Sequence, residues 1–324
     1  MAGGQERILR RRIKSVQSTK KITKAMELIA ASRIVKAQQR VAAARPYAEK
    51  ITAVIGNLAA GGAGMASPLL TPRESVSKVA FVAVCADRGL AGAYNTNVIR
   101  ATERAILATK ADGKEYGLIC VGKKAEGYFR FRGYTIDASF TGMSDQPGYE
   151  DARRVAAAVT EHFESGKYDQ VELVYTQFLS AGTQRVAQRR FMPIDSESLT
   201  ATIDEGPTAD YEFEPSPGLI LERLLPRYAE ARLFAAMLEA AASEHAARQR
   251  AMKSATDNAE ELITKLSRIM NRARQDAITT EIMEIVGGAE AQSQSSSSDE
   301  DTLIDHIGPQ EIFPQHRDRR HDHV

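Results

Sequence analysis

The chain has 324 residues, of which 43% are hydrophobic and 26% are charged, and its formal net charge is +1. This composition is ordinary for a protein that buries a large core, and the length predicts one or two compact units. No run approaches the roughly 18 to 20 consecutive apolar residues of a membrane helix, and the first residues lack the apolar core of a signal peptide. We therefore expect the protein to stay in the cytoplasm.

The cysteines also limit the possible chemistry. Cys85 and Cys120 are the only two, and each lies in an apolar, strand-like run away from other ligand-type residues. This pattern argues against a disulfide framework and against a zinc site. We predict two buried, unpaired thiols.

The first block, residues 5–58, has the composition of one long helix. It contains a single proline, Pro46, and no glycine between Gly4 and Gly56. Its apolar residues recur with helical spacing, so each triplet should lie on one face. The triplets are Leu9, Ile13, Val16 and Ile22, Met26, Ile29.

The same block is strongly basic. Residues 1–40 hold eleven Lys or Arg against Glu6 and Glu27, a local balance of +9. Nucleic acid, anionic lipid and an acidic protein surface all attract such a helix by the same long-range field. The sign of the charge does not choose among these partners.

The second block, about 75–200, changes its period. Near-continuous apolar runs at 79–86, 117–121 and 171–175 predict strands that are covered on both faces. Helical stretches at 97–109 and 150–163 alternate with them, which indicates a mostly parallel α/β sheet. Residues 184–194, which include Pro193, are typical of an edge strand.

The third block is a second long helix. Ser216 and Pro217 are a suitable N-cap and first position, and Gly287 and Gly288 a suitable stop. From residue 241 the inward positions alternate by four and three, which predicts a coiled-coil seam. The seam positions are Ala241, His245, Arg248, Met252, Ala255, Ala259, Leu262, Leu266, Ile269 and Ala273.

These changes divide the chain into five parts. We expect an N-terminal coiled-coil helix at 1–60, a linker at 61–75, an α/β foot domain at 76–205, a C-terminal coiled-coil helix at 206–289 and a tail at 290–324. The tail is rich in serine and acidic residues and contains four of the six histidines. We expect it to be disordered and assign it no function.

The two long helices need a partner for their apolar stripes. At 1.5 Å per residue they would rise roughly 75 and 90 Å, several times the width of the α/β block. The economical arrangement is a long antiparallel coiled coil of the N- and C-terminal helices with a Rossmann-like α/β domain inserted between them. Such a shape favours a mechanical role.

Three motifs resemble the gamma subunits of bacterial F-type ATP synthases. Residues 11–27 read Arg-Arg-Ile-Lys-Ser-Val-Gln-Ser-Thr-Lys-Lys-Ile-Thr-Lys-Ala-Met-Glu, and the first strand ends Asp87-Arg88-Gly89-Leu90-Ala91-Gly92. The last helix contains Ala-Met-Lys-Ser-Ala-Thr-Asp-Asn-Ala at 251–259, Ala-Arg-Gln-Asp-Ala-Ile-Thr-Thr-Glu-Ile at 273–282 and Ile-Val-Gly-Gly-Ala at 285–289. Together the motifs bracket residues 5–289.

The resemblance implies a non-catalytic rotor shaft with no cofactor, no metal and no nucleic-acid partner. It would transmit rotation of the proton-driven c-ring to the catalytic ring of three alpha and three beta subunits. In this family the paired helices enter that ring, while the foot joins the epsilon subunit and the c-ring. The complex would lie on the cytoplasmic side of the cell membrane, reached only through the c-ring.

The resemblance also carries residues over by position. The matches to contacts with the alpha and beta subunits are Arg7, Arg10, Arg11, Arg12, Met26, Arg248, Gln275 and Thr279. The matches to the segment that approaches epsilon and the c-ring are Tyr211, Glu212 and Phe213.

Some of these residues have a structural alternative. Met26 could pack in the helix seam, and Arg248 could have a buried partner within the chain, although a long charged side chain can also reach outward. Gln275 and Thr279 lie four apart, as do many solvated pairs. The family also ends soon after 285–289, so the 35 residues after Ala289 are unexplained.

Two other classes of function remain as rivals. A nucleotide-dependent enzyme would need a phosphate loop, but there is no G-x-G-x-x-G, and Val121-Gly122-Lys123-Lys124 lacks the spacing of a P-loop. The histidines His162 and His245 form no catalytic pattern with the cysteines. A nucleic-acid-binding coiled coil fits the charge, but the first aromatic residue is Tyr47, so stacking residues are missing.

Overall fold

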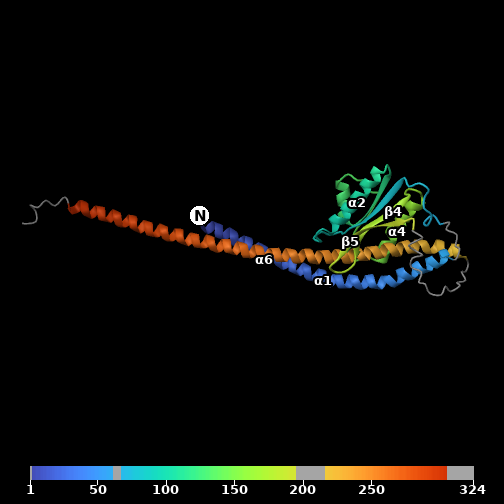
Figure 1. Ribbon diagram of the computed structural model, residues 1–324. Helices are drawn as coiled ribbons and strands as arrows, with labels where there is room; N and C mark the ends of the chain where they lie inside the picture. The colour runs from blue at the N-terminus through green and yellow to red at the C-terminus, as the bar shows by residue number, and fades with distance from the viewer. Residues whose placement is uncertain (1, 61–66, 195–215, 305–324) are drawn as a thin grey trace, which may run out of the picture. The chain divides into compact units, whose positions relative to one another are not determined.

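The computed structural model describes residues 2–60, 67–194 and 216–304. These residues fall into a central unit, Thr19–Asn258, and a terminal unit, Met1–Ser18 with Ala259–Val324. Figure 1 labels six of the elements: α1, α2, α4, α6, β4 and β5. In chain order the helices and strands are α1 (Ala2–Ala60), β1 (Lys78–Val84), α2 (Tyr94–Ala111), β2 (Glu115–Val121), α3 (Lys123–Phe131), β3 (Ala138–Phe140), α4 (Tyr149–Glu164), β4 (Gln170–Phe178), β5 (Gln184–Met192) and α6 (Pro217–Ile304).

The central unit contains one five-stranded sheet with the order β3-β2-β1-β4-β5. The first four strands are parallel, and β5 pairs antiparallel with β4 at the edge. The predicted strands and helices of this block are confirmed, including the edge strand. The sequence did not predict the short elements α3 and β3.

The strands are apolar on both sides because both faces of the sheet are covered. Along β1, Val82 points into a core built with α1, α4 and α6, whereas Phe81 points into a second core built with α2 and α3. Figure 1 shows α2 on one side of the sheet and α1 and α6 on the other. This layered arrangement confirms the predicted Rossmann-like domain.

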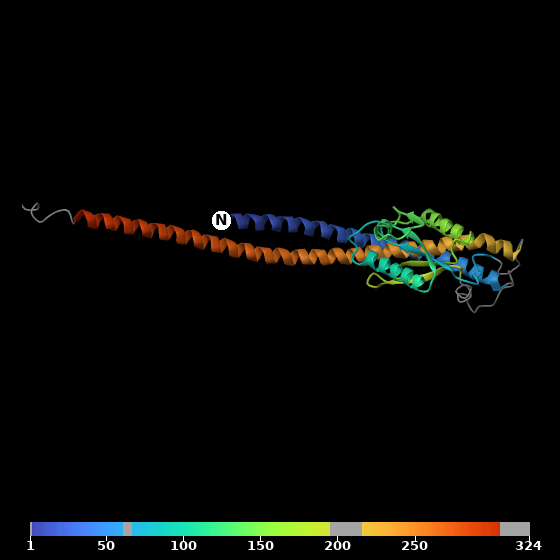
Figure 2. The ribbon, with the colours of Figure 1, turned by 90° about the horizontal axis from the view of Figure 1, so that it is seen from above.

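Within the central unit, α1 and α6 run antiparallel. The hydroxyl oxygens of Thr23 and Thr256 are 2.8 Å apart, while Ile55 and Leu225 share the core at the other end of both segments. Figures 1 and 2 show the two helices side by side. The antiparallel pairing is confirmed, and the seam positions Ala241 and Met252 are buried.

The second apolar triplet of α1 lies mostly on an outward face of the helix. Ile22 is 61% exposed and Ile29 is 55% exposed, whereas Ala30 and Ile34 are buried. The inward stripe runs through Thr23, one position from Ile22. The small Ala30 lies on the buried side of the helix, and the large isoleucines lie on the outside.

The predicted end of α6 at the glycine pair is also wrong. The helix continues through Gly287 and Gly288 to Ile304 and includes residues 290–304, which we expected to be disordered. A helical glycine costs about 1 kcal/mol relative to alanine, but Ala289, Glu290 and Ala291 resume good helix formers at once. Residues 305–324 lie outside the described part of the chain.

In the terminal unit, α1 and α6 lie side by side in both views (Figures 1 and 2). Ile13 of the first predicted triplet and Leu266 of the predicted seam are buried. Leu262 and Ile269 are more than one third exposed, so the seam is looser than the strict pattern predicts.

Candidate functional site

The turn after β1 is organised by the carboxylate of Asp87. It accepts hydrogen bonds from the backbone N–H groups of Lys123, Gly142 and Ser144, each at 3.0 Å. Burial alone would raise the pKa of Asp87, but these backbone hydrogen bonds lower it below its usual range. An internal carboxylate therefore occupies the N-terminus of α3, where a phosphate loop would hold its ligand.

Gly122, which follows β2, stands where the surrounding backbone leaves no room for a side chain. Its φ is +99°, and a Cβ atom there would lie 2.2 Å from the backbone oxygen of Cys85. The close approach of two neighbouring turns is therefore the reason for this glycine, and the glycine does not indicate a nucleotide site.

Helix α6 crosses the carboxyl ends of β1 and β4, where open α/β sheets usually bind ligands. Its side chains donate hydrogen bonds to three backbone carbonyls there: Ser243 to Thr176 at 3.2 Å, Arg248 to Gly89 at 3.4 Å and Arg250 to Ala181 at 2.8 Å. An open hollow of about 400 Å³ remains beside Arg250. The carboxyl ends of these strands are thus occupied by a helix of the same chain.

Arg248 lies inside the chain, as the structural alternative had it. It is 8% exposed, and its guanidinium donates to the carboxylate of Glu244, which is 1% exposed. Burial raises the pKa of Glu244, and the charge of Arg248 offsets part of that rise. Arg248 is therefore the internal counter-charge of a buried acid, one helical turn away.

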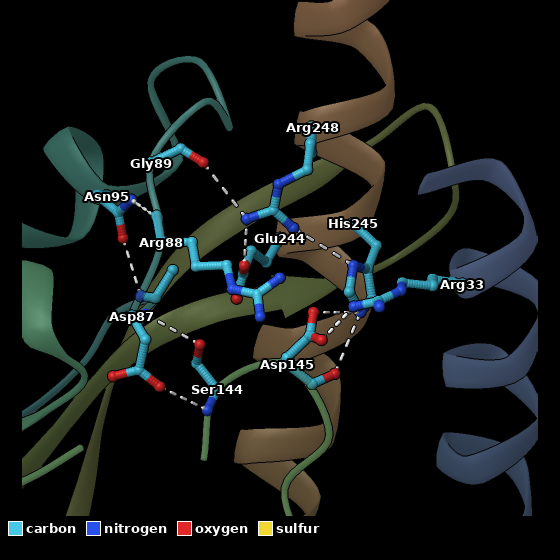
Figure 3. Close-up of polar contacts among 11 residues, drawn as sticks. Arg33, Asp87, Arg88, Gly89, Asn95, Ser144, Asp145, Glu244, His245 and Arg248 are labelled. Atoms are coloured by element: carbon cyan, nitrogen blue, oxygen red, sulfur yellow. Dashed lines mark hydrogen bonds and ion pairs between the residues drawn. The ribbon is translucent and has the colours of Figure 1, made fainter. Parts of the chain in front are cut away.

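A second part of the same cluster joins three segments of the central unit (Figure 3). Arg33 of α1 pairs with the carboxylate of Asp145, in the loop before α4. His245 of α6 lies 3.2 Å from the backbone oxygen of Asp145 through Nε2. These contacts fasten both long helices to the α/β domain.

Apolar side chains face outward on α1 in the central unit. Ile22, Leu28, Ile29 and Val35 are all more than half exposed. Met26, which the resemblance matches to a beta-subunit contact, is half-buried on the same segment. This outward stripe has no cover within the described residues.

The terminal unit carries most of the other carried-over residues. Arg7, Arg10, Arg11 and Arg12 are exposed, and only Arg10 among them has an ion-pair partner in the described residues, Glu6 at 2.6 Å.

Gln275 and Thr279 lie farther along the same unit, on α6. Both are exposed, and the hydroxyl of Thr279 donates to the backbone oxygen of Gln275 at 3.0 Å. No described side chain covers either residue, so both remain free for a partner.

The same part of α6 leaves a run of apolar residues uncovered. Every side chain from 278 to 293 is exposed. The apolar ones are Ile278, Ile282, Met283, Ile285 and Val286, between 47% and 70% exposed. The sequence motif drew attention to this segment, but the periodic pattern did not predict that its apolar face is open.

The predicted contacts to epsilon and the c-ring, Tyr211, Glu212 and Phe213, lie outside the described residues.

Cys85 and Cys120 are buried free thiols, as predicted. Burial raises the pKa of both, that of Cys120 to about 12. Thiols of this kind stay protonated and unreactive at neutral pH.

The described residues contain no group of three or more His, Cys, Asp or Glu side chains that could hold a metal ion. In the same residues, no helix is long and apolar enough to cross a membrane.

Comparison with protein families gives one match that spans nearly the whole chain. The family described as ATP synthase matches residues 5–292. Among curated relatives, an "ATP synthase gamma chain" from Frankia casuarinae is 54% identical over 292 residues, which cover 89% of this chain and 98% of that relative. The gamma chain from Kineococcus radiotolerans is 47% identical over 91% of this chain and 99% of that relative.

Solved structures support the same fold. A chain of the Euglena gracilis mitochondrial ATP synthase OSCP/F1/c-ring structure matches with a TM-score of 0.64 and 19% identity, over 97% of this chain and 100% of that chain. A chain of the Tetrahymena thermophila central stalk and c-ring structure matches with a TM-score of 0.56 and 23% identity, over 72% and 99% respectively.

Proposed function

The chain belongs to the ATP synthase gamma chain family and forms the central rotor shaft of that enzyme, and we propose that it transmits rotation without catalysing ATP chemistry itself. One observation carries the second half of this proposal. Open α/β sheets usually bind ligands at the carboxyl ends of their strands, and here α6 crosses these ends. Hydrogen bonds from α6 to nearby backbone carbonyls hold the helix there.

The outward apolar residues indicate which surfaces contact other subunits. A rotor shaft must touch the alpha and beta subunits of the catalytic ring and the c-ring that drives it, and solved relatives come from assemblies that contain F1 and the c-ring. We assign the outward apolar residues of α1 and those of 278–286 to contacts with the catalytic ring of alpha and beta subunits. The epsilon subunit is a further proposed partner at the foot, and the cytoplasmic side of the cell membrane is the proposed location.

Rotation can drive ATP synthesis only if the shaft prefers one state of the beta subunit over another. A ligand with equal affinity for both states shifts no equilibrium, so the shaft must present a different surface to each beta subunit. Gln275 and Thr279 on one side of α6, and Arg7, Arg10, Arg11 and Arg12 on α1, are proposed members of this uneven surface. Met26 is a further proposed contact.

The proposed partner role of Arg248 needs one more condition. Its guanidinium is used by Glu244 within the chain, so it must leave that carboxylate before it can reach a beta subunit. Tyr211, Glu212 and Phe213 remain predicted contacts to epsilon and the c-ring.

The experiment is to mix the full chain with purified alpha and beta subunits and to measure the stoichiometry and ATP hydrolysis of the product. We expect one copy of this chain for three alpha and three beta subunits, with hydrolysis by the complex and no tight nucleotide binding by the chain alone. A chain cut after residue 270 is the matched comparison and should assemble poorly. A folded full chain that fails to associate with competent partners contradicts the proposal, and tight nucleotide binding by the isolated chain would restore the enzyme alternative.

A further inference from the structure

His245 lies between a cation and a carbonyl in the interior of the central unit (Figure 3). The side chain is 2% exposed. Its Nε2 is 3.2 Å from the backbone oxygen of Asp145, and its Nδ1 is 3.5 Å from Nη1 of Arg248.

These two neighbours fix the state of the ring. A carbonyl oxygen only accepts hydrogen bonds, so Nε2 must carry the hydrogen that it donates to Asp145. A guanidinium group only donates, so Nδ1 must be bare in order to accept from Arg248. Both contacts are satisfied together only by neutral imidazole with its hydrogen on Nε2.

Protonation of the ring places a second hydrogen on Nδ1. That hydrogen would face the N–H of Arg248, so two donors and two positive charges would meet at 3.5 Å in a buried place. The Nε2 contact to Asp145 survives because it still has its donor. The group that must move is therefore the guanidinium of Arg248.

The surrounding charges do not cancel this conflict. Burial lowers the pKa of His245, and the hydrogen bond and the charge of Asp145 offset only part of the effect. The carboxylate of Asp145 is already paired with Arg33, which is itself a repelling cation. The charged groups that face His245 and Asp145 from the packed elements are Arg33 on α1, Arg88 after β1, Asp145 before α4, and Glu244 and Arg248 on α6.

We propose that His245 is a proton-sensitive positioning residue: neutral His245 holds Arg248 inward on Glu244 and Gly89, and protonation of His245 turns the guanidinium of Arg248 away. This inference goes beyond the proposed function, since it rests on contacts within the central unit alone. It adds a condition under which Arg248 becomes free.

The buried carboxylate supports the same direction. Once Arg248 leaves, Glu244 lacks its counter-charge, and burial raises the pKa of this acid. A lower pH supplies a proton to Glu244 as well as to His245, so the two protonations favour each other. The inward position of Arg248 is thus complete at neutral pH and is lost only as the pH falls through the pKa of His245, which burial holds below the usual histidine value of about 6.5.

The test uses the full chain labelled with ¹⁵N arginine and histidine and follows the signals by NMR between pH 7.5 and 5. The signal of His245 is assigned by its loss in His245→Gln, and the Nε–Hε signal of Arg248 by its loss in Arg248→Lys. The amide of glutamine can donate to Asp145 but does not titrate in this range. His162→Gln is the matched control because His162, on α4, lies outside the cluster.

We expect the Arg248 signal of the parent chain and of His162→Gln to move toward the position of a free arginine over the same pH range in which His245 titrates. In His245→Gln the Arg248 signal should stay in place. An Arg248 signal that is unchanged while His245 titrates overturns the proposal, as does a His245→Gln chain with the same pH response as the parent. A His245 signal that never titrates above pH 5 in the folded chain overturns it as well.

Discussion

Helix α6 passes through two very different environments. In the central unit many of its side chains from Leu221 to Thr256 are buried, and most of those from Leu221 to Ala240 pack into the core of the sheet. In the terminal unit every side chain from 278 to 293 is exposed, although the apolar content remains high. The first part is stabilised by its own chain, and the second presents an apolar surface that the described residues of the chain leave uncovered.

This contrast shows that helical periodicity alone does not reveal what a helix packs against. Isolated helices gain little stability in water, and most of their stability in proteins comes from packing. A helix that keeps its apolar residues where its own chain offers no cover is typical of a surface that binds a partner. Four predictions test this account, in order of the expected effect.

The largest expected difference is between Leu233→Ala and Ile282→Ala. Leu233 is fully buried in the core, so its truncation should lower the free energy of unfolding by about 3 kcal/mol through lost contacts and a cavity. Ile282 is 54% exposed, so its truncation should change this free energy by less than about 0.5 kcal/mol. Urea unfolding of the isolated chain measures both, and equal losses would show that residues near 282 are packed within the chain after all.

Arg248→Met tests the buried ion pair. Removal of the cation leaves Glu244 buried without a counter-charge, which should cost about 3 kcal/mol at pH 7. The double variant Glu244→Gln with Arg248→Met should be more stable than Arg248→Met alone, because no buried charge is left unpaired. Lys253→Met, at an exposed position of the same helix, is the control and should have a small effect. A double variant less stable than Arg248→Met would mean that Glu244 is not the group left unpaired.

Asp87→Asn tests the turn that replaces a phosphate loop. The loss of a carboxylate that accepts three backbone hydrogen bonds should cost about 2 kcal/mol at pH 7. The pKa of Asp87 is lowered in the folded chain, so the unfolded chain binds the proton more readily. The stabilisation is present above the unfolded pKa of about 4 and is lost as the pH falls through the lower folded value.

Unfolding of this variant is therefore compared with the parent from pH 7 to pH 3. The advantage of the parent should shrink as the pH falls below about 4. The exposed Asp276 provides the control, and Asp276→Asn should follow the parent throughout. A constant difference between Asp87→Asn and the parent at all pH values would mean that the charge of Asp87 is not what stabilises the turn.

The smallest expected effect on the chain itself belongs to Gln275→Ala. The side chain is exposed, so the free energy of unfolding should change by less than about 0.5 kcal/mol. In the complex with alpha and beta subunits, ATP hydrolysis should fall about fivefold, the effect of roughly 1 kcal/mol at an interface. Glu161→Ala, on the exposed side of α4, should leave hydrolysis unchanged. Full activity of Gln275→Ala would remove this residue from the proposed contacts.

The sequence predicted the fold well where a pattern was long and regular. Two helical blocks around alternating strands and helices were enough for the antiparallel pair and the Rossmann-like sheet. The end of α6 could not be predicted, because Gly287 and Gly288 are a local stop signal that the strong helix formers after them override. The outward position of Ile22 and Ile29 could not be predicted either, because tertiary packing decides which side of α1 is buried.

The site was predictable only in part, for the same reason. Glu244 and Arg248 are four residues apart on a helix, a spacing at which opposite charges pair, so their contact could have been recognised from the sequence. The contact between His245 and Asp145 joins residues 100 positions apart and required the fold. Exposure of residues 278–293 likewise depends on what the rest of the chain fails to cover.

The most direct test of the contrast within α6 is hydrogen–deuterium exchange of residues 278–293, measured in the isolated chain and in the complex with alpha and beta subunits. We predict fast exchange in the isolated chain, where no described residue packs on this segment, and strong protection in the complex, while residues 221–256 are protected in both. Equal exchange of residues 278–293 in the two states would contradict the account, since it would mean that the exposed apolar surface of the shaft is not what the catalytic ring covers.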